Sequence, residues 1–173
     1  MKRLSILLFC LLLATGCQLN SPQKAPLAKN GVLDLRGWDF EKNGTVRLDG
    51  EWEFYWEQLL QPKDFINTPP VAKTGYITVP GNWNGYEVNG KKLNGNGFAT
   101  YRLVIKVDPK VDLLAFKLPS ISTAYKMWIN SHEASSNGIV GKNRATMTPE
   151  YAPNVTALPN GAGTIDLVIQ ASN

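Results

Sequence analysis

The sequence predicts an all-β protein built as an antiparallel β-sandwich of about eight to ten strands. Three observations carry this prediction: apolar and polar residues alternate over short segments, eight Asn-Gly dipeptides separate those segments, and no long helical pattern lies between them. Because a parallel sheet needs crossover helices, a βαβ architecture is excluded. With 173 residues, 43% of them hydrophobic, the chain is long enough for one packed domain.

The first clear strand covers residues 51–56, where three aromatic residues share one face and alternate with more polar residues. Four later segments repeat this period of two, and each is expected to place its apolar side chains on a core. The inward positions are Trp52, Phe54 and Trp56; Ala99, Tyr101, Leu103, Ile105 and Val107; Leu114, Phe116 and Leu118; Tyr125, Met127 and Ile129; and Ile165, Leu167 and Ile169.

The Asn-Gly pairs between these strands are typical of tight turns, because both residues tolerate positive φ. They begin at Asn30, Asn43, Asn84, Asn89, Asn94, Asn96, Asn137 and Asn160. A helical turn or two is expected only at residues 56–65, where Pro62 interrupts the pattern.

Residues 1–16 are typical of a secretory signal peptide: Lys2 and Arg3 precede an apolar run and then small residues before Cys17. The run is about ten residues long, whereas a membrane-spanning helix needs about 20. The stretch that ends at Cys17 resembles a bacterial lipobox, which predicts lipid attachment at Cys17; ordinary signal cleavage is the alternative. We therefore expect an exported protein, periplasmic or at the cell surface, that is anchored to the membrane.

Residues 17–30 are polar and lack periodicity, so they are predicted to be a flexible tether, and residues 31–173 form the domain. Removal of the leader takes away Lys2 and Arg3 and so halves the net charge of +4. No basic run longer than Lys91-Lys92 remains, which argues against a nucleic-acid partner. Because residues 164–171 read as a core strand just before the last residue, the domain is expected to be truncated at its C-terminal end.

Five motifs follow one another in an order that resembles a galactose-binding-like jelly roll. They are Leu48 to Phe54, Val79 to Trp83, Ala99 to Arg102, Lys126 to Asn130, and Leu167 to Gln170. The same succession resembles the sugar-binding domain of glycoside hydrolase family two. It is more similar to the extracellular domain of bacterial seven-transmembrane receptors with diverse intracellular signalling modules, and the features that favour this family are residues 37–40, 52–60 and 119–125.

The resemblance implies a non-catalytic domain that binds a small molecule or carbohydrate, in a receptor for signal transduction. An ancillary domain of a glycoside hydrolase family two enzyme and a free-standing binding lipoprotein are the alternatives. The membrane is a second expected partner, through the lipid anchor or through a segment downstream of the domain. No cofactor is expected.

Residues 80–98 form the most distinctive polar loop, and its candidate ligand-binding residues are Trp83, Asn84 and Tyr86. Aromatic rings pack on the apolar face of a pyranose while amides bond its hydroxyls. Alternatively, Trp83 plugs the end of the sandwich and Tyr86 covers a strand edge. Packing is favoured for Trp83, and both interpretations stay open for Tyr86.

No catalytic or metal site is expected. His132 is the only histidine, and it falls in a predicted exposed turn, so neither a triad nor a tetrahedral zinc site can be assembled. Glu51 and Glu53 lie on one face of a strand, about 7 Å apart by strand rise. Alternating acids mark the solvent side of a strand, so a glycosidase pair is disfavoured. A structural calcium ion is left open.

Overall fold

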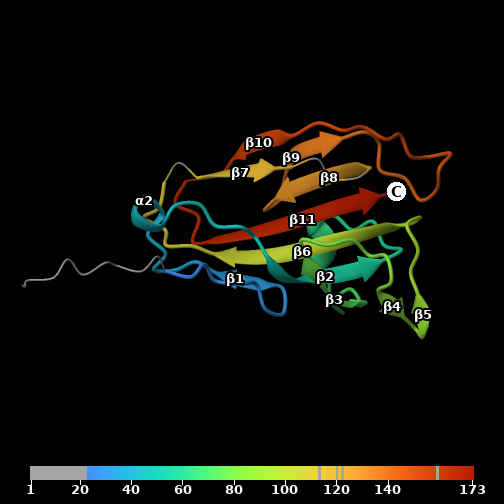
Figure 1. The fold of residues 1–173 in the computed structure, drawn as a ribbon, viewed down its shortest axis with the longest axis horizontal. Helices are drawn as coiled ribbons and strands as arrows, with labels where there is room; N and C mark the ends of the chain where they lie inside the picture. The colour runs from blue at the N-terminus through green and yellow to red at the C-terminus, as the bar shows by residue number, and fades with distance from the viewer. Residues whose placement is uncertain (1–22, 113, 120, 122, 159) are drawn as a thin grey trace, which may run out of the picture.

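The computed structural model describes residues 23–112, 114–119, 121, 123–158 and 160–173 (Figure 1). The strands are β1 (Val32–Asp34), β2 (Gly50–Trp56), β3 (Gly75–Val79), β4 (Glu87–Val88), β5 (Lys91–Lys92), β6 (Phe98–Lys106), β7 (Ala115–Leu118), β8 (Ala124–Ile129), β9 (His132–Asn137), β10 (Asn154–Ala157) and β11 (Thr164–Ser172). Within these residues the strands are accompanied by two short helices, α2 (Phe40–Asn43) and the 3-10 helix η1 (Pro62–Ile66).

The principal sheet has the strand order β3-β2-β6-β11-β8-β9, with every neighbour antiparallel. β1 joins it in parallel: Val32 to Asp34 lie beside Val104 to Lys106, while β2 lies beside the first half of β6. Two small antiparallel sheets, β7 with β10 and β4 with β5, complete the fold. The predicted all-β sandwich is confirmed, with one parallel pairing added.

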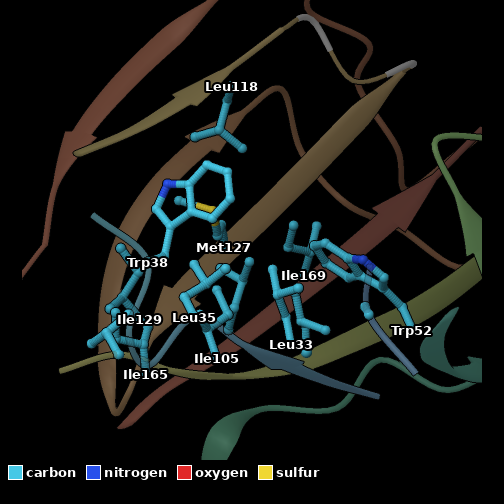
Figure 2. Packing of buried hydrophobic residues seen from close by; sticks show 14 of the residues in the cluster. Leu33, Leu35, Trp38, Trp52, Ile105, Leu118, Met127, Ile129, Ile165 and Ile169 are labelled. Carbon is cyan, nitrogen blue, oxygen red and sulfur yellow. The ribbon is translucent and has the colours of Figure 1, made fainter. Parts of the chain in front are cut away.

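The core lies between the inner face of the principal sheet and a second layer formed by β7 and the segment that follows β1. Figure 2 shows the Trp38 ring between Leu118 and Met127, with Leu35 beside it. Trp52 is also buried, and its indole nitrogen donates to the carbonyl of Leu48 at 2.9 Å. The inner residues of β6, β8 and β11 are those at the alternating positions predicted from the sequence.

The strand predictions are confirmed with small shifts at the ends, whereas the helical prediction is only partly met. The helical turns expected at residues 56–65 reduce to η1, which begins at Pro62. α2 was not predicted, although Asp39 caps it by accepting from the amides of Glu41 and Lys42 at 3.1 and 3.0 Å. One turn of helix is too short to show periodicity, so its cap was the available signal.

The tight turn between β8 and β9 contains only Asn130 and Ser131. Asn130 takes a φ of 54°, a conformation that asparagine tolerates well.

In the described part of the chain, no helix is both long enough and apolar enough to cross a membrane.

Candidate functional site

Trp83 is part of a second, smaller core at the end of the sandwich. Its side chain is only 5% exposed, and its ring stands edge-on to Trp56 with 5.4 Å between the ring centres. The cluster also contains Phe54 and Ile77. The indole nitrogen is buried and has no hydrogen-bond partner within the described residues. Trp83 therefore plugs the end of the sandwich, which leaves no exposed ring face for a sugar.

Tyr86 is half-buried and packs on the same small core. Its ring meets Phe54 edge-on at 5.2 Å. Its hydroxyl occupies the space that a Cβ at residue 75 would need, so Gly75 permits this close approach. Asn84 is exposed, and its backbone amide donates to the side-chain Oδ1 of Asn82 at 3.0 Å. The three predicted ligand residues are thus neighbours in the loop, but two of them serve packing.

An open groove of about 370 Å³ lies beside this loop, at the end of the sandwich where β2 and β11 end and β6 begins. The predicted loop contributes only its last part to it. The groove is lined by Glu57, Asn96, Gly97, Phe98, Gly141, Lys142, Asn143, Arg144, Met147 and Asn173.

The floor of the groove is fixed by the pairing of the loop end with the end of β11. Gly97 and Asn173 exchange two backbone hydrogen bonds of 3.0 and 2.9 Å. The Trp56 ring lies where a side chain at Gly97 would lie, and Trp83 packs on Trp56. Trp83 therefore supports the groove from beneath, through Trp56, without lining it.

The opposite wall is a loop, residues 141–147, that is held by its own hydrogen bonds. Oδ1 of Asn143 accepts from the amides of Ala145 and Thr146 at 3.0 and 3.1 Å. The Gly141 amide donates to the buried Ser172 hydroxyl at 3.2 Å, which ties this wall to β11. Such bonds organise the wall before any ligand arrives.

The polar side chains that line the groove carry amide groups or charged groups. Nη2 of Arg144 donates to Oδ1 of Asn96 at 3.3 Å, which joins the two walls. Lys142 is exposed and forms no ion pair with the described residues, and Glu57 is the acid of the lining. The groove thus offers hydrogen-bond donors and acceptors around the half-buried Phe98 ring.

A smaller depression of about 230 Å³ lies between η1 and β8. Its lining includes Gln61, Lys63, Ile66 and Trp128. Trp128 is only 6% exposed, and Gln61 is the single amide side chain in the lining, so this depression offers fewer polar groups to a ligand.

Glu53 corrects the prediction that both acids of β2 face solvent. Its side chain is only 18% exposed. Its carboxylate lies 3.4 Å from Nη1 of Arg102 and 3.3 Å from Nζ of Lys73, and it accepts from the Tyr55 hydroxyl at 2.9 Å. Burial, reinforced by this bond to Glu53, raises the pKa of Tyr55 above its ordinary value.

Glu51, in contrast, is exposed, and its carboxylate accepts from the amide of Asn30 at 3.1 Å. A glycosidase acid must carry a proton at working pH. Glu53 instead lies in ion pairs with Lys73 and Arg102, at 3.3 and 3.4 Å, and not in an apolar pocket. The pair therefore lacks the environment that general-acid catalysis needs.

His132 lies at the start of β9 and is exposed, in agreement with its predicted place near a turn. Within the described residues, no group of three or more His, Cys, Asp and Glu side chains could hold a metal ion. Cys17, the predicted lipid-attachment residue, lies outside the described residues, as does the predicted leader.

The groove was missed at the sequence level. Gly141 is followed by a polar run of Lys142, Asn143 and Arg144, which was the available signal for a second loop. Asn96, the hydrogen-bond partner of Arg144 across the groove, lies 48 residues away from Arg144 in the sequence. Only the topology brings the two together.

Neither a family model nor a curated protein matches the chain. Among solved structures, β-glucuronidase from Faecalibacterium prausnitzii is similar with a TM-score of 0.54 and 17% identity over 73% of this chain and 20% of that chain. A β-glucuronidase from Ruminococcus gnavus in complex with uronic isofagomine gives a TM-score of 0.50, also at 17% identity, over 73% of this chain and 20% of that chain.

These likenesses show a shared fold, and the chain spans about a fifth of each enzyme. Both neighbours are glycosidases, so they agree with the resemblance to the sugar-binding domain of a glycoside hydrolase. They give no support to the resemblance to a receptor.

Proposed function

We propose that this chain is a non-catalytic carbohydrate-binding domain of the kind that accompanies a glycoside hydrolase, and that its ligand lies in the groove between Asn96 and Arg144. The observation that carries the proposal is the lining of this groove, where amides, cations and an aromatic ring meet at one end of the sandwich. The fold shared with glycosidases supports the substrate class. The signalling role in a receptor has no such support.

The chemistry of the lining suits a sugar. Amide groups such as the Asn96 side chain can donate to and accept from hydroxyls, and Phe98 adds an apolar side chain to the lining. Lys142 and Arg144 add donors that need no rearrangement of an ion pair before they bind. Tyr86 and Trp83 act by supporting the loop, so their contribution to binding is indirect.

Glycan-array screening of the purified protein, followed by calorimetry with the best oligosaccharide, tests the site. Lys142→Ala and Asn96→Ala each remove an exposed polar side chain of the lining, so we expect affinity to fall several-fold with the fold intact. The matched control is Lys110→Ala, an exposed lysine in the loop after β6, at the opposite end of that strand.

Equal affinities for Lys142→Ala, Asn96→Ala and Lys110→Ala would place the ligand outside the groove. Asn84→Ala tests the originally predicted loop separately. If Asn84→Ala abolishes binding while the groove variants do not, the exposed rim of residues 80–98 is the site instead.

The same proposal includes export and anchoring through Cys17, which rests on the lipobox-like sequence alone. Expressed in a bacterium with its leader, the protein should partition into the detergent phase, and Cys17→Ser should move it to the aqueous phase. Identical partitioning of the two forms would remove the lipid anchor from the proposal and leave the groove untouched.

A further inference from the structure

The eight Asn-Gly pairs are chemically labile as well as being turn formers. In such a pair the glycine amide nitrogen can attack the asparagine side-chain carbonyl carbon. A five-membered succinimide forms, ammonia leaves, and water opens the ring to aspartate or isoaspartate. Water is the only co-reactant. The reaction needs a glycine amide that is free to lose its proton and a side chain that is free to reach it.

Five of the pairs have their glycine amide engaged in a hydrogen bond. The acceptors are the carbonyls of Glu51 for Gly31 at 3.0 Å, Phe40 for Gly44 at 3.0 Å, Leu93 for Gly85 at 2.9 Å and Asn173 for Gly97 at 3.0 Å, and the Glu150 carboxylate for Gly138 at 2.9 Å. Each of these amides must leave its acceptor before it can attack, so each pair is protected by a local opening step.

The pair Asn94-Gly95 is held in other ways. Oδ1 of Asn94 accepts from the amide of Asn96 at 2.9 Å, and the carbonyl of Gly95 accepts from the side chain of Asn173 at 2.5 Å. The side chain and the peptide that would have to close the ring are therefore both tethered. The pair Asn160-Gly161 follows residue 159, which lies outside the described residues, and it takes no part in this comparison.

Asn89-Gly90 differs from all of these. The pair forms the tip of the β4–β5 hairpin, which projects from the sheet (Figure 1), and both residues are exposed. Their φ values of 50° and 74° are those of a type I′ turn. Within the described part of the chain, neither the Gly90 amide nor the Asn89 side chain has a hydrogen-bond partner, and a Cβ at Gly90 would meet nothing within 4 Å.

We infer that Asn89 is the site of selective spontaneous deamidation in this protein, and that the other pairs with bonded glycine amides are protected by the fold. The product places a carboxylate beside Lys91 and Lys92, and isoaspartate inserts one more backbone atom into a hairpin of two residue pairs. The modification therefore changes both charge and register on the loop that borders the groove.

Peptide mapping by mass spectrometry tests this inference on the purified folded protein during incubation in mildly alkaline buffer. We expect Asn89 to react at least about tenfold faster than Asn30, Asn96 or Asn137, the ratio that corresponds to about 1.4 kcal/mol for opening one hydrogen bond. In strong denaturant the rates should converge, because the protecting bonds are then absent.

Asn89→Gln is the matched control, since a six-membered ring closes far more slowly. It should abolish the early product and leave the slow reaction at the other pairs unchanged. Rates at Asn30 and Asn137 equal to that at Asn89 in the folded protein would overturn the inference, as would an unchanged early product in Asn89→Gln. Sugar binding plays no part in this test, so it stands apart from the proposed function.

Discussion

Arg102 joins three strands on the outer face of the principal sheet, and its removal gives a sharp test of how the sheet is held. From β6, its Nε and Nη2 atoms form a two-pronged contact with Asp166 of β11 at 2.8 and 3.0 Å. Nη1 reaches Glu53 of β2 at 3.4 Å, and the guanidinium lies 4.6 Å from the centre of the Phe65 ring. The Arg102 side chain is 23% exposed.

The expected loss in Arg102→Ala follows from this partial burial. Breaking a fully buried pair costs about 3 to 5 kcal/mol because it leaves an uncompensated charge, whereas an exposed pair is worth roughly 0.2 to 1 kcal/mol. Asp166 and Glu53 lie between these limits, at 27% and 18% exposure. We therefore expect the free energy of unfolding to fall by about 2 to 3 kcal/mol.

Chemical denaturation measures this loss directly, and thermal unfolding should show a Tm lower by roughly 5 to 10 °C. Arg47→Ala is the matched control, because Arg47 pairs with Asp49 at 2.9 Å while its own side chain is 75% exposed. Its effect should stay within about 0.5 kcal/mol. Arg102→Lys keeps the charge but loses the planar fork, so it should recover only part of the loss. If Arg102→Ala and Arg47→Ala destabilise equally, the argument from burial is refuted.

Three further tests address the core, the groove and a surface pair. Trp52→Ala should cost about 3 to 5 kcal/mol in chemical denaturation, as expected for a truncated buried tryptophan, and a loss below about 1 kcal/mol would contradict its place in the core. Gly97→Ala should weaken sugar binding in calorimetry, because the new methyl group would displace the Trp56 ring beneath the groove; unchanged affinity would argue against that support. The Arg36 guanidinium holds the pKa of the Asp34 carboxyl at about 2. The ionised Asp34 carboxylate therefore stabilises the fold at pH values above the ordinary carboxyl pKa, and this stabilisation is lost as the pH falls toward 2. Arg36→Ala should raise that pKa toward 3.8 in an NMR titration, and an unchanged value would show that Arg36 is not its cause.

The strands were predictable because a period of two is a local property of the sequence. In β11, Ile165, Leu167 and Ile169 contact the core whatever their partners are, so the pattern alone places them inward. The role of Glu53 is not local. It depends on the register that sets β2 beside β6, where Glu53 lies opposite Arg102. From the sequence alone, without knowledge of that register, an acidic residue at an outward position is predicted to be solvent-exposed.

The candidate site was less predictable for a related reason. Composition correctly marked residues 80–98 as an unusual loop, but it could not tell that Trp83 turns inward onto Trp56. The groove needs Asn96 and Arg144 on facing walls and Asn173 between them, and these positions come together through the order of strands in the sheet. The residue types in a loop indicate which ligands it can bind, whereas the strand order determines which loops lie together in one site.

The position of β11 also has a consequence for how the chain reaches its fold. β11 lies between β6 and β8, although it follows the other described strands in sequence, and its register pairs Thr164 with Lys106 and Ser172 with Phe98. Until β11 arrives, β2 with β6 and β8 with β9 are two separate hairpin-like halves with open edges. Contacts of such long sequence separation close slowly. A chain synthesised from its N-terminus therefore has two unpaired sheet edges until β11 inserts between them. During that interval the exposed edges favour aggregation.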